Sequence, residues 1–191
     1  MSMITEEKAT LRKKIRGQMR RMDPSLRAES DSSICQRVSL LSQFQLSETI
    51  FCFVGIGWEI NTRPLILNAL NCGKRVAIPL CTAPGIMEAR LIDSLEHLKP
   101  GAYGIPEPSL DSPICPFTEI DFAIVPCVAC DSSCMRLGQG GGFYDQFMAK
   151  YTVYTAALCR DEALLEKVPT EAWDYPVDCV VTESQTYFLK H

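Results

Sequence analysis

Compact apolar runs alternate with segments of helical periodicity along most of the chain. The apolar runs are short, rich in β-branched and aromatic residues, and lack polar alternation. Such runs are typical of strands that are buried on both faces. They occupy residues 49–54, 75–79, 121–125, 154–158 and 179–182, and a further candidate strand covers 87–92. The pattern predicts buried strands separated by helices, as in a parallel sheet that is covered on both faces.

Helical periodicity is clearest near the start of the chain. Over 8–22, one apolar stripe recurs at steps of four, four and three residues, at Leu11, Ile15, Met19 and Met22. Asp23 and Pro24 then predict a new helix start, with an apolar face of Leu26, Ile34, Val38, Leu41 and Phe44. Further helices are predicted over 62–70, 142–150 and 164–167, with a helical turn over 94–98 and a long loop over 99–116. These elements predict an α/β fold, an open and mostly parallel sheet in a Rossmann-like three-layer sandwich.

A glycine-rich stretch over 136–145 carries the strongest chemical signal. Four glycines lie within 138–142, and Phe143, Tyr144 and Asp145 follow. Free backbone amides in such a loop form an anion site, which a helix starting just after it improves. Arg136 adds positive charge at one end, and Asp145 could hold a metal ion at the other. The stretch therefore predicts a phosphate cradle with a cation site beside it.

An ordinary loop is the alternative interpretation of these glycines. The P-loop pattern does not fit, because no Lys-Ser or Lys-Thr pair follows them. The dinucleotide fingerprint does not fit either, because it requires glycine where Phe143 stands. A phosphate loop here would therefore be of another kind.

Composition excludes several classes of protein. The 191 residues, 47% hydrophobic and 22% charged, predict one globular domain over 1–191. The net charge of −4 does not favour nucleic-acid binding, and the basic face of the first helix lacks interleaved aromatic residues. No apolar run approaches the roughly 20 residues of a membrane span. The first residues lack the apolar core of a secretion signal, so we expect the cytoplasm as location.

Ten cysteines are many for a cytoplasmic protein. Most lie in apolar stretches, where a free thiol behaves as a small apolar residue. Cys127, Cys130 and Cys134 are close in sequence and could form a zinc or redox-sensing site. Plain core and loop thiols are preferred, because structural zinc usually takes four ligands and neither His97 nor His191 is near. The scarcity of histidine also argues against Ser-His-Asp and Cys-His chemistry.

Two candidate segments follow predicted strands. Glu59 comes after the strand at 49–54, and the glycine stretch comes after the strand at 121–125. Ligands of open parallel sheets bind outside the carboxyl ends of the strands, so we expect both segments to face one crevice. A single glutamate in a loop is more often merely solvated, and only its position beside Trp58 raises Glu59 above that alternative.

The stretch Arg136-Leu-Gly-x-Gly-Gly-Gly-Phe-Tyr-Asp145 resembles the signature of the 5-formyltetrahydrofolate cyclo-ligase family, also called methenyltetrahydrofolate synthetase. Other segments resemble the family in the same order along the chain. They are Lys8-x-x-x-Arg12, Glu59-x-x-Thr62, residues 74–79, 101–108, 125–131 and 173–182. Each segment alone is weak, whereas the ordered set covers nearly the whole chain.

The resemblance implies the ATP- and Mg²⁺-dependent conversion of 5-formyltetrahydrofolate to 5,10-methenyltetrahydrofolate, with release of ADP and phosphate. In the implied mechanism the formyl oxygen attacks the γ-phosphate, and the neighbouring folate amine closes the ring as phosphate leaves. Such phosphoryl transfer needs positioning and charge neutralisation rather than a histidine base. It also implies small-molecule partners, and we expect a monomer. A non-catalytic folate- or nucleotide-binding paralogue is the alternative, because a fold alone does not define activity.

The resemblance implies roles at matched positions. The ATP-binding positions are Lys8, Arg12, Arg136, Leu137, Gly138, Gln139, Gly140, Gly141, Gly142, Phe143 and Tyr144. The substrate-binding positions are Val54, Glu59, Phe143 and Tyr144. Asp145 and Asp174 match the magnesium positions, and Arg136, Tyr144 and Asp145 match catalytic ones.

Several positions depart from the family pattern. Cys127 and Cys134 stand where glycine is common, and Cys130 stands where an aromatic residue is common. Gln139 and Gly141 stand where some members carry basic residues. We expect the cysteines to alter loop geometry and pocket filling, and the other two positions to affect binding of ATP or of a polyglutamate tail.

Overall fold

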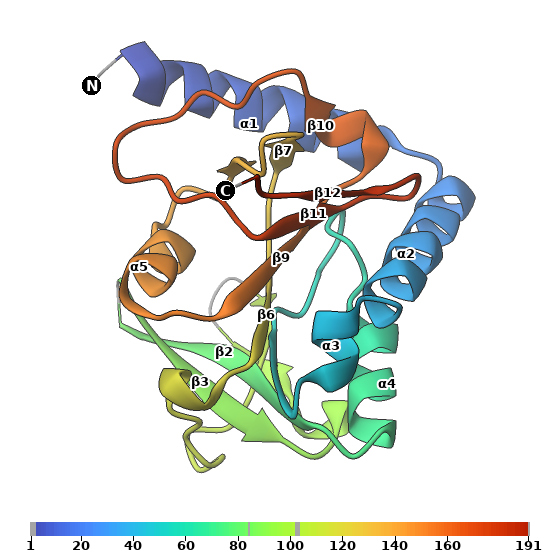
Figure 1. The fold of residues 1–191 in the computed structure, drawn as a ribbon, viewed down its shortest axis with the longest axis vertical. Coiled ribbons are helices and arrows are strands. Elements are labelled where there is room, and N and C mark those ends of the chain that lie inside the picture. The colour runs from blue at the N-terminus through green and yellow to red at the C-terminus, as the bar shows by residue number, and fades with distance from the viewer. Residues whose placement is uncertain (1–2, 84, 102–103, 191) are drawn as a thin grey trace.

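A seven-stranded sheet forms the centre of the protein. The computed structural model describes residues 3–83, 85–101 and 104–190 (Figure 1). The strands of the main sheet are β1 (Thr49–Cys52), β2 (Arg75–Ala83), β3 (Ile86–Ile92), β6 (Phe122–Val125), β9 (Tyr154–Leu158), β11 (Cys179–Val181) and β12 (Thr186–Phe188). Their order is β12-β11-β9-β6-β1-β2-β3. The five inner strands run parallel, while β12 and β3 are antiparallel to their neighbours.

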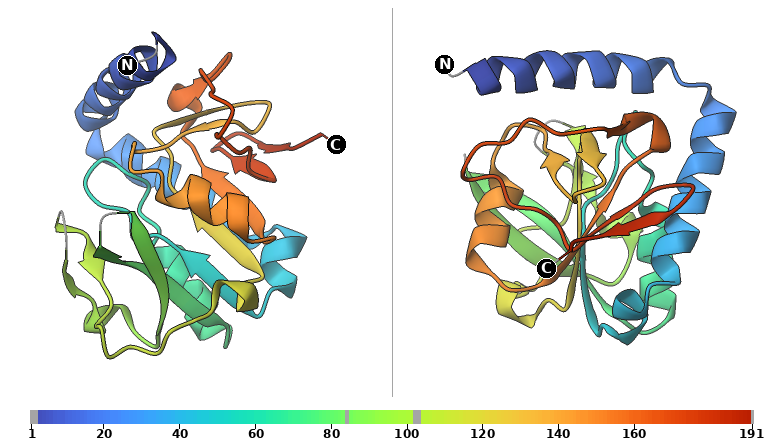
Figure 2. Two further views of the ribbon diagram at one scale, coloured as in Figure 1. Left: turned by 90° about the vertical axis from the view of Figure 1, so that its left-hand side faces the viewer. Right: turned by 45° about the horizontal axis from the view of Figure 1, so that its top comes forward.

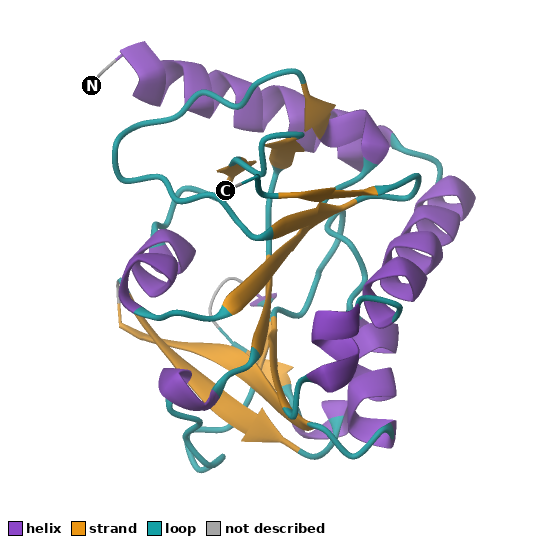
Figure 3. Cartoon of the chain, viewed as in Figure 1, coloured by secondary structure: helices purple, strands orange, loops and turns teal. Residues whose placement is uncertain are grey.

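Helices cover both faces of this sheet (Figure 3). They are α1 (Met3–Arg21), α2 (Pro24–Ser39), α3 (Ser42–Leu46), α4 (Arg63–Asn71) and α5 (Phe143–Lys150). Helices α2, α3 and α4 lie on one face and α5 on the other, while α1 lies across the end where the parallel strands finish (Figures 1 and 2). This arrangement confirms the predicted three-layer α/β fold.

Each inner strand divides its side chains between two hydrophobic clusters, because successive residues point to opposite faces. Ile50 and Ile124 belong to the cluster beneath α2 and α4. Phe51 and Ala123 belong to the cluster that α1 and α5 cover. All four are fully buried, which explains why the strands show no polar alternation in the sequence.

A second, three-stranded sheet leads into the glycine stretch. It consists of β7 (Ala129–Asp131), β8 (Arg136–Leu137) and β10 (Leu164–Leu165), in the order β10-β7-β8. The helix predicted over 164–167 is therefore wrong. Only the preceding turn, Asp161–Ala163, is helical, and Leu164 pairs in parallel with Cys130. Strands this short are defined by their partners, and local periodicity does not reveal them.

Asp131 holds this small sheet together. Its buried carboxylate accepts hydrogen bonds from the backbone N–H groups of Ser133 at 2.9 Å, Met135 at 3.2 Å and Val168 at 2.8 Å. The carboxylate thus satisfies three amides that have no strand partner there, and it fixes the turn that precedes Arg136.

The ends of the helices differ from the prediction in two places. Helix α1 begins at Met3 rather than at residue 8. The second predicted helix is divided into α2 and α3, and Leu26 is 53% exposed, so it does not belong to the buried face. The predicted start is confirmed, because the Asp23 carboxylate accepts a hydrogen bond from the Ser25 N–H at 2.8 Å.

The predicted loop over 99–116 contains little regular structure. Two-residue strands β4 (Lys99–Pro100) and β5 (Pro106–Glu107) pair within it, while residues 102–103 lie outside the described ranges. Short 3-10 turns lie on either side, at Leu95–His97 and Phe117–Glu119. Among the described residues, no helix combines the length and apolar character that crossing a bilayer requires.

Candidate functional site

The glycine loop lies between β8 and α5, and its backbone requires glycine at several positions. Gly140 has φ 104° and Gly142 has φ 70°, conformations that residues with a side chain rarely adopt. A Cβ at Gly138 would lie 2.7 Å from the Arg136 guanidinium, and one at Gly141 would lie 2.9 Å from the ring of Phe143. Glycine is therefore required in this loop both for its backbone conformation and because neighbouring side chains leave no room for a Cβ atom.

Helix α1 places two arginines against this loop. The Arg12 Nε donates to the Gly138 carbonyl at 2.8 Å. Arg16 donates to the Gln139 carbonyl at 3.1 Å and to its side-chain oxygen at 2.6 Å. Arg12 was predicted to lie here. No role was predicted for Arg16, which is one helical turn further along the same face.

Lys8, also on α1, is buried and forms ion pairs with two acids from the C-terminal part of the chain. Its Nζ lies 3.0 Å from a carboxylate oxygen of Glu171 and also contacts Asp174. The Asp174 carboxylate further accepts the Glu171 N–H at 2.7 Å. The structure thus joins two predicted residues that are 166 positions apart, and it adds Glu171, which the sequence analysis missed.

Arg136 and Asp145 form a third ion pair of the site, at 2.8 Å. The guanidinium carbon of Arg136 also lies 5.9 Å from the ring centroid of Tyr144. Burial raises the pKa of Asp145, Arg136 opposes that shift, and the nearby carboxylate of Asp174 adds to it. The Arg136 Nε is buried and has no hydrogen-bond partner within the described part of the chain.

Arg12 links these groups electrostatically. Burial lowers its pKa most, and Arg16 lowers it further, while Asp174 and Asp145 act in the opposite direction. Charges affect one another's pKa only at short range, so Arg12 lies near both Asp145 and Asp174.

Glu59 reaches the loop from the end of β1. It accepts a hydrogen bond from Gln139 Nε2 at 2.7 Å and one from the Ile56 N–H at 3.1 Å. Burial raises its pKa, and the two hydrogen bonds lower it less. The contact with Gln139 brings Glu59 directly beside the glycine stretch.

Thr62 shapes the segment that carries Glu59. Its hydroxyl donates to the Phe53 carbonyl at 2.7 Å and accepts the Gly55 N–H at 3.1 Å. A Cβ at Gly55 would lie 1.8 Å from the Ile60 carbonyl oxygen, so only glycine fits there. This part of the motif is a folded turn whose side chains bond its own backbone.

The aromatic and apolar candidates are divided between the two faces of the sheet. Tyr144 packs against the cluster that α1 and α5 cover, 6.2 Å from Phe51 between ring centroids, and burial raises its pKa. Phe143 is half-buried next to it. Val54 is buried in the other cluster.

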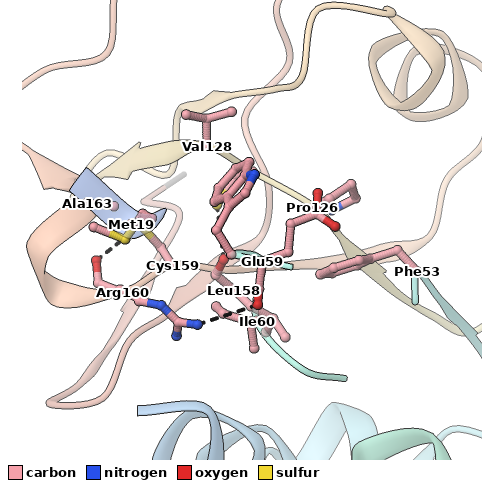
Figure 4. A pocket seen from close by; sticks show the side chains of 12 residues that line it. Met19, Phe53, Glu59, Ile60, Pro126, Val128, Leu158, Cys159, Arg160 and Ala163 are labelled. Atoms are coloured by element: carbon pink, nitrogen blue, oxygen red, sulfur yellow. Dashed lines mark hydrogen bonds between the residues drawn. The ribbon is translucent and has the colours of Figure 1, made fainter. Parts of the chain in front are cut away.

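A pocket adjoins Glu59 where β6 and β9 end (Figure 4). Its wall includes Trp58, Glu59, Pro126, Cys127, Cys159 and Arg160. The Arg160 guanidinium is buried and donates to Ser30 Oγ at 2.8 Å and to the carboxylate of Asp31 at 2.7 Å. No local sequence pattern indicates this residue, because its partners are far away in sequence, on α2.

The clustered thiols differ from those expected. Cys127, Cys130 and Cys159 have Sγ atoms within 4.8 Å of one another. Thiol hydrogen bonds from the other two lower the pKa of Cys127, whose ionised sulfur they favour. Cys134 is not part of this group: its thiol donates to the Tyr187 carbonyl at 3.6 Å, and its φ of 65° explains why glycine suits this position. The observed cluster therefore differs in one member from Cys127, Cys130 and Cys134, which were the less favoured zinc or redox alternative to plain thiols.

The fold and the loop define an α/β protein with buried cations and carboxylates around a glycine-rich loop at the carboxyl end of its sheet. A model of the 5-formyltetrahydrofolate cyclo-ligase family matches residues 4–183. The chain belongs to this family and is therefore an enzyme of the ligase class.

Individual relatives agree with this assignment. The 5-formyltetrahydrofolate cyclo-ligase of Escherichia coli K12 is 31% identical over 179 residues, which cover 91% of this chain and 98% of that protein. A probable 5-formyltetrahydrofolate cyclo-ligase of Schizosaccharomyces pombe is 30% identical over 78% of this chain and 82% of its own.

Solved structures give the same fold. The 5,10-methenyltetrahydrofolate synthetase of Aquifex aeolicus superposes with a TM-score of 0.87 at 27% identity, covering 96% of this chain and 93% of its own. A Mycoplasma pneumoniae structure at 18% identity and a TM-score of 0.74, covering 92% of this chain and 98% of its own, supports the fold alone.

Proposed function

We propose that this protein converts 5-formyltetrahydrofolate to 5,10-methenyltetrahydrofolate in a reaction that consumes ATP and requires Mg²⁺. The observation that carries the proposal is the convergence of α1 cations, the glycine loop and two carboxylates on one side of Glu59. Family membership supports the activity, and this cluster supplies the chemical groups that phosphoryl transfer needs.

The phosphates of ATP would bind along the glycine loop. Arg12 and Arg136 supply fixed positive charge, and Lys8 supplies an ammonium group that Glu171 and Asp174 hold in position. Phosphate oxygens would take over part of the hydrogen bonding that these carboxylates now accept. Backbone amides from Gly138 to Gly142, just before α5, would contribute further donors.

Asp145 and Asp174 fit a magnesium site. Their carboxylates are close enough that Asp174 contributes to the raised pKa of Asp145, and a divalent cation would relieve this repulsion. Carboxylate oxygens are also the protein ligands that Mg²⁺ prefers. When bound, the ion supplies neutralisation of charge on the phosphate oxygens.

The folate would lie between Glu59 and the aromatic residues at the start of α5. The Glu59 carboxylate would accept hydrogen bonds from the pterin ring, and the half-buried Phe143 and Tyr144 would line the apolar part. In the reaction the formyl oxygen attacks the γ-phosphorus and ADP leaves. The neighbouring folate amine then attacks the activated carbon, loses its proton, and phosphate departs.

The test is turnover by the purified protein. With 5-formyltetrahydrofolate, ATP and Mg²⁺, we expect a product that absorbs at longer wavelength, formed together with an equal amount of ADP. Folded protein that binds both ligands in calorimetry but gives no product would instead support the non-catalytic paralogue. The cytoplasmic location, the monomeric state and the absence of nucleic-acid partners stay predictions, which fractionation, light scattering and salt-dependent RNA binding would test.

A further inference from the structure

Three thiols meet near the place where β6 and β9 end. Cys127 follows β6, Cys130 lies in β7, and Cys159 follows β9 (Figure 4 labels Cys159). Their Sγ atoms all lie within 4.8 Å of one another. Cys130 and Cys159 are buried, whereas Cys127 is partly exposed and lies on the wall of the pocket beside Glu59. The cluster therefore combines a protected interior with access from one side.

This spacing is close to what one metal ion requires. Zinc binds thiolate at about 2.3 Å in tetrahedral geometry, so two sulfur ligands of one ion lie about 3.8 Å apart. Movements of a fraction of an ångström in each side chain bring three sulfurs from within 4.8 Å to that separation. Two of the three thiols directly follow strands of the parallel sheet, so the backbone fixes their positions before an ion binds.

We propose that Cys127, Cys130 and Cys159 form a binding site for one Zn²⁺ ion, with the fourth coordination position directed toward the pocket. Three protein ligands and one open position are typical of zinc sites that keep a water molecule or a further ligand. The site is independent of the proposed folate reaction.

Charge favours Zn²⁺ over Cu⁺ as the occupant. Binding releases the three thiol protons, so a zinc ion leaves a net charge of about −1 and a cuprous ion about −2. Burial penalises the larger uncompensated charge more. Arg160 is buried at the same pocket, but it is already ion-paired with Asp31 and therefore offsets only part of the negative charge of the metal–thiolate complex.

The binding test uses the reduced full-length protein, freed of metal and kept without oxygen. Titration with Co²⁺, a spectroscopic substitute for zinc, should saturate at one equivalent with a sulfur-to-cobalt charge-transfer band that Zn²⁺ then abolishes. Cys127→Ser should weaken binding at least tenfold. Cys81→Ser removes another partly exposed thiol, and Cys134→Ser removes the third member of the trio expected from sequence; both should bind as the wild type does.

Several results would overturn the proposal. They are the absence of a charge-transfer band in the wild-type protein, a band that Cys127→Ser leaves unchanged, and tight Cu⁺ binding to these thiols without any for Co²⁺ or Zn²⁺. A second measurement does not depend on the variants folding. Zn²⁺ should slow alkylation of Cys127 in the wild-type protein at least tenfold while the alkylation rate of Cys81 stays unchanged, as read by peptide mass spectrometry; equal rates with and without Zn²⁺ would refute it.

Discussion

Acidic side chains at the two ends of the parallel sheet have different kinds of partner. Where strands begin, Asp121 precedes β6 and accepts the Thr49 N–H of neighbouring β1 at 2.8 Å. Asp178 precedes β11 in the same way and accepts the Thr155 N–H of neighbouring β9 at 2.7 Å. Both carboxylates bond backbone of the adjacent strand, so they help to fix its register.

Where the strands finish, the acids of the candidate site are paired with polar or charged side chains. Asp145 contacts Arg136, Asp174 contacts Lys8, and Glu59 contacts Gln139. The difference indicates that the first end serves the fold, while the second holds charged groups for a ligand. Perturbed acids in a crevice are typical of functional sites, where activity is maintained at some expense of stability.

The largest expected effect is on turnover, at the end where the strands finish. Asp145→Asn and Arg136→Ala should each lower kcat for the proposed reaction about 100- to 1000-fold, because each removes a charge that positions or neutralises the transferred phosphoryl group. Steady-state kinetics on protein with unchanged circular dichroism measures this. Asp178→Asn at the other end is the matched control and should retain turnover. Near-normal rates in both site variants would refute their roles.

The next effect is on stability, at the end where the strands begin. Asp178→Ala should lower the free energy of unfolding by about 2–3 kcal/mol, because it leaves the buried N–H and hydroxyl of Thr155 without their acceptor. Denaturant unfolding measures the loss, while turnover per folded molecule should be unchanged. An Asp178→Ala variant that is as stable as the wild type but inactive would show that this end of the sheet serves activity rather than the fold.

The sequence predicted six of the seven strands of the main sheet, all but β12, and named most residues of the candidate site, because those features leave local signals. Apolar runs identified the inner strands, and ordered motifs identified Lys8, Arg136 and Asp174. The location of the site at the carboxyl ends of the parallel strands could be predicted from topology alone, since all parallel strands finish on one side of the sheet. Burial and pairing of these charges did not follow, because they depend on contacts across the whole chain.

The errors share one physical cause, which is that their partners are remote in sequence. Leu164 and Leu165 form a strand only because β7 lies beside them. Cys159 replaces Cys134 in the thiol cluster because β9 ends next to β6, although the two cysteines are 25 positions apart. Glu171 has no motif of its own, and only the buried ammonium of Lys8 reveals its role.

A smaller effect is expected from glycine substitutions that share backbone strain but differ in place. Gly140→Ala and Gly73→Ala each put a side chain at positive φ, 104° and 75°, and each should cost about 1–2 kcal/mol of stability. Only Gly140 lies near Arg12, 3.6 Å from its guanidinium carbon to an added Cβ. Gly140→Ala should therefore also raise the KM for ATP severalfold, whereas Gly73→Ala should not. If both variants have the same KM for ATP, the glycine loop does not take part in nucleotide binding.

The smallest expected effect is a pH dependence that distinguishes the two kinds of acid. Burial raises the pKa of Glu59 in the folded protein, so the folded state keeps this proton to higher pH than the unfolded chain does. The stabilisation that Glu59 contributes to the wild-type protein is fully present below the ordinary glutamate pKa. It is lost as the pH rises through the higher pKa of Glu59 in the folded protein. The melting temperature of Glu59→Gln, measured relative to the wild type, should therefore increase over that window and then level off.

Asp23 provides the control of opposite sign. Hydrogen bonds from Ser25 hold its pKa below the ordinary value, so its stabilisation is present above the unfolded pKa and is lost as the pH falls. Asp23→Asn should accordingly lose stability relative to the wild type as the pH rises. If the melting temperatures of both variants, relative to the wild type, change in the same direction as the pH rises, burial does not disfavour the ionised form of Glu59. That result would contradict the distinction between acids that stabilise the fold and acids that serve a ligand.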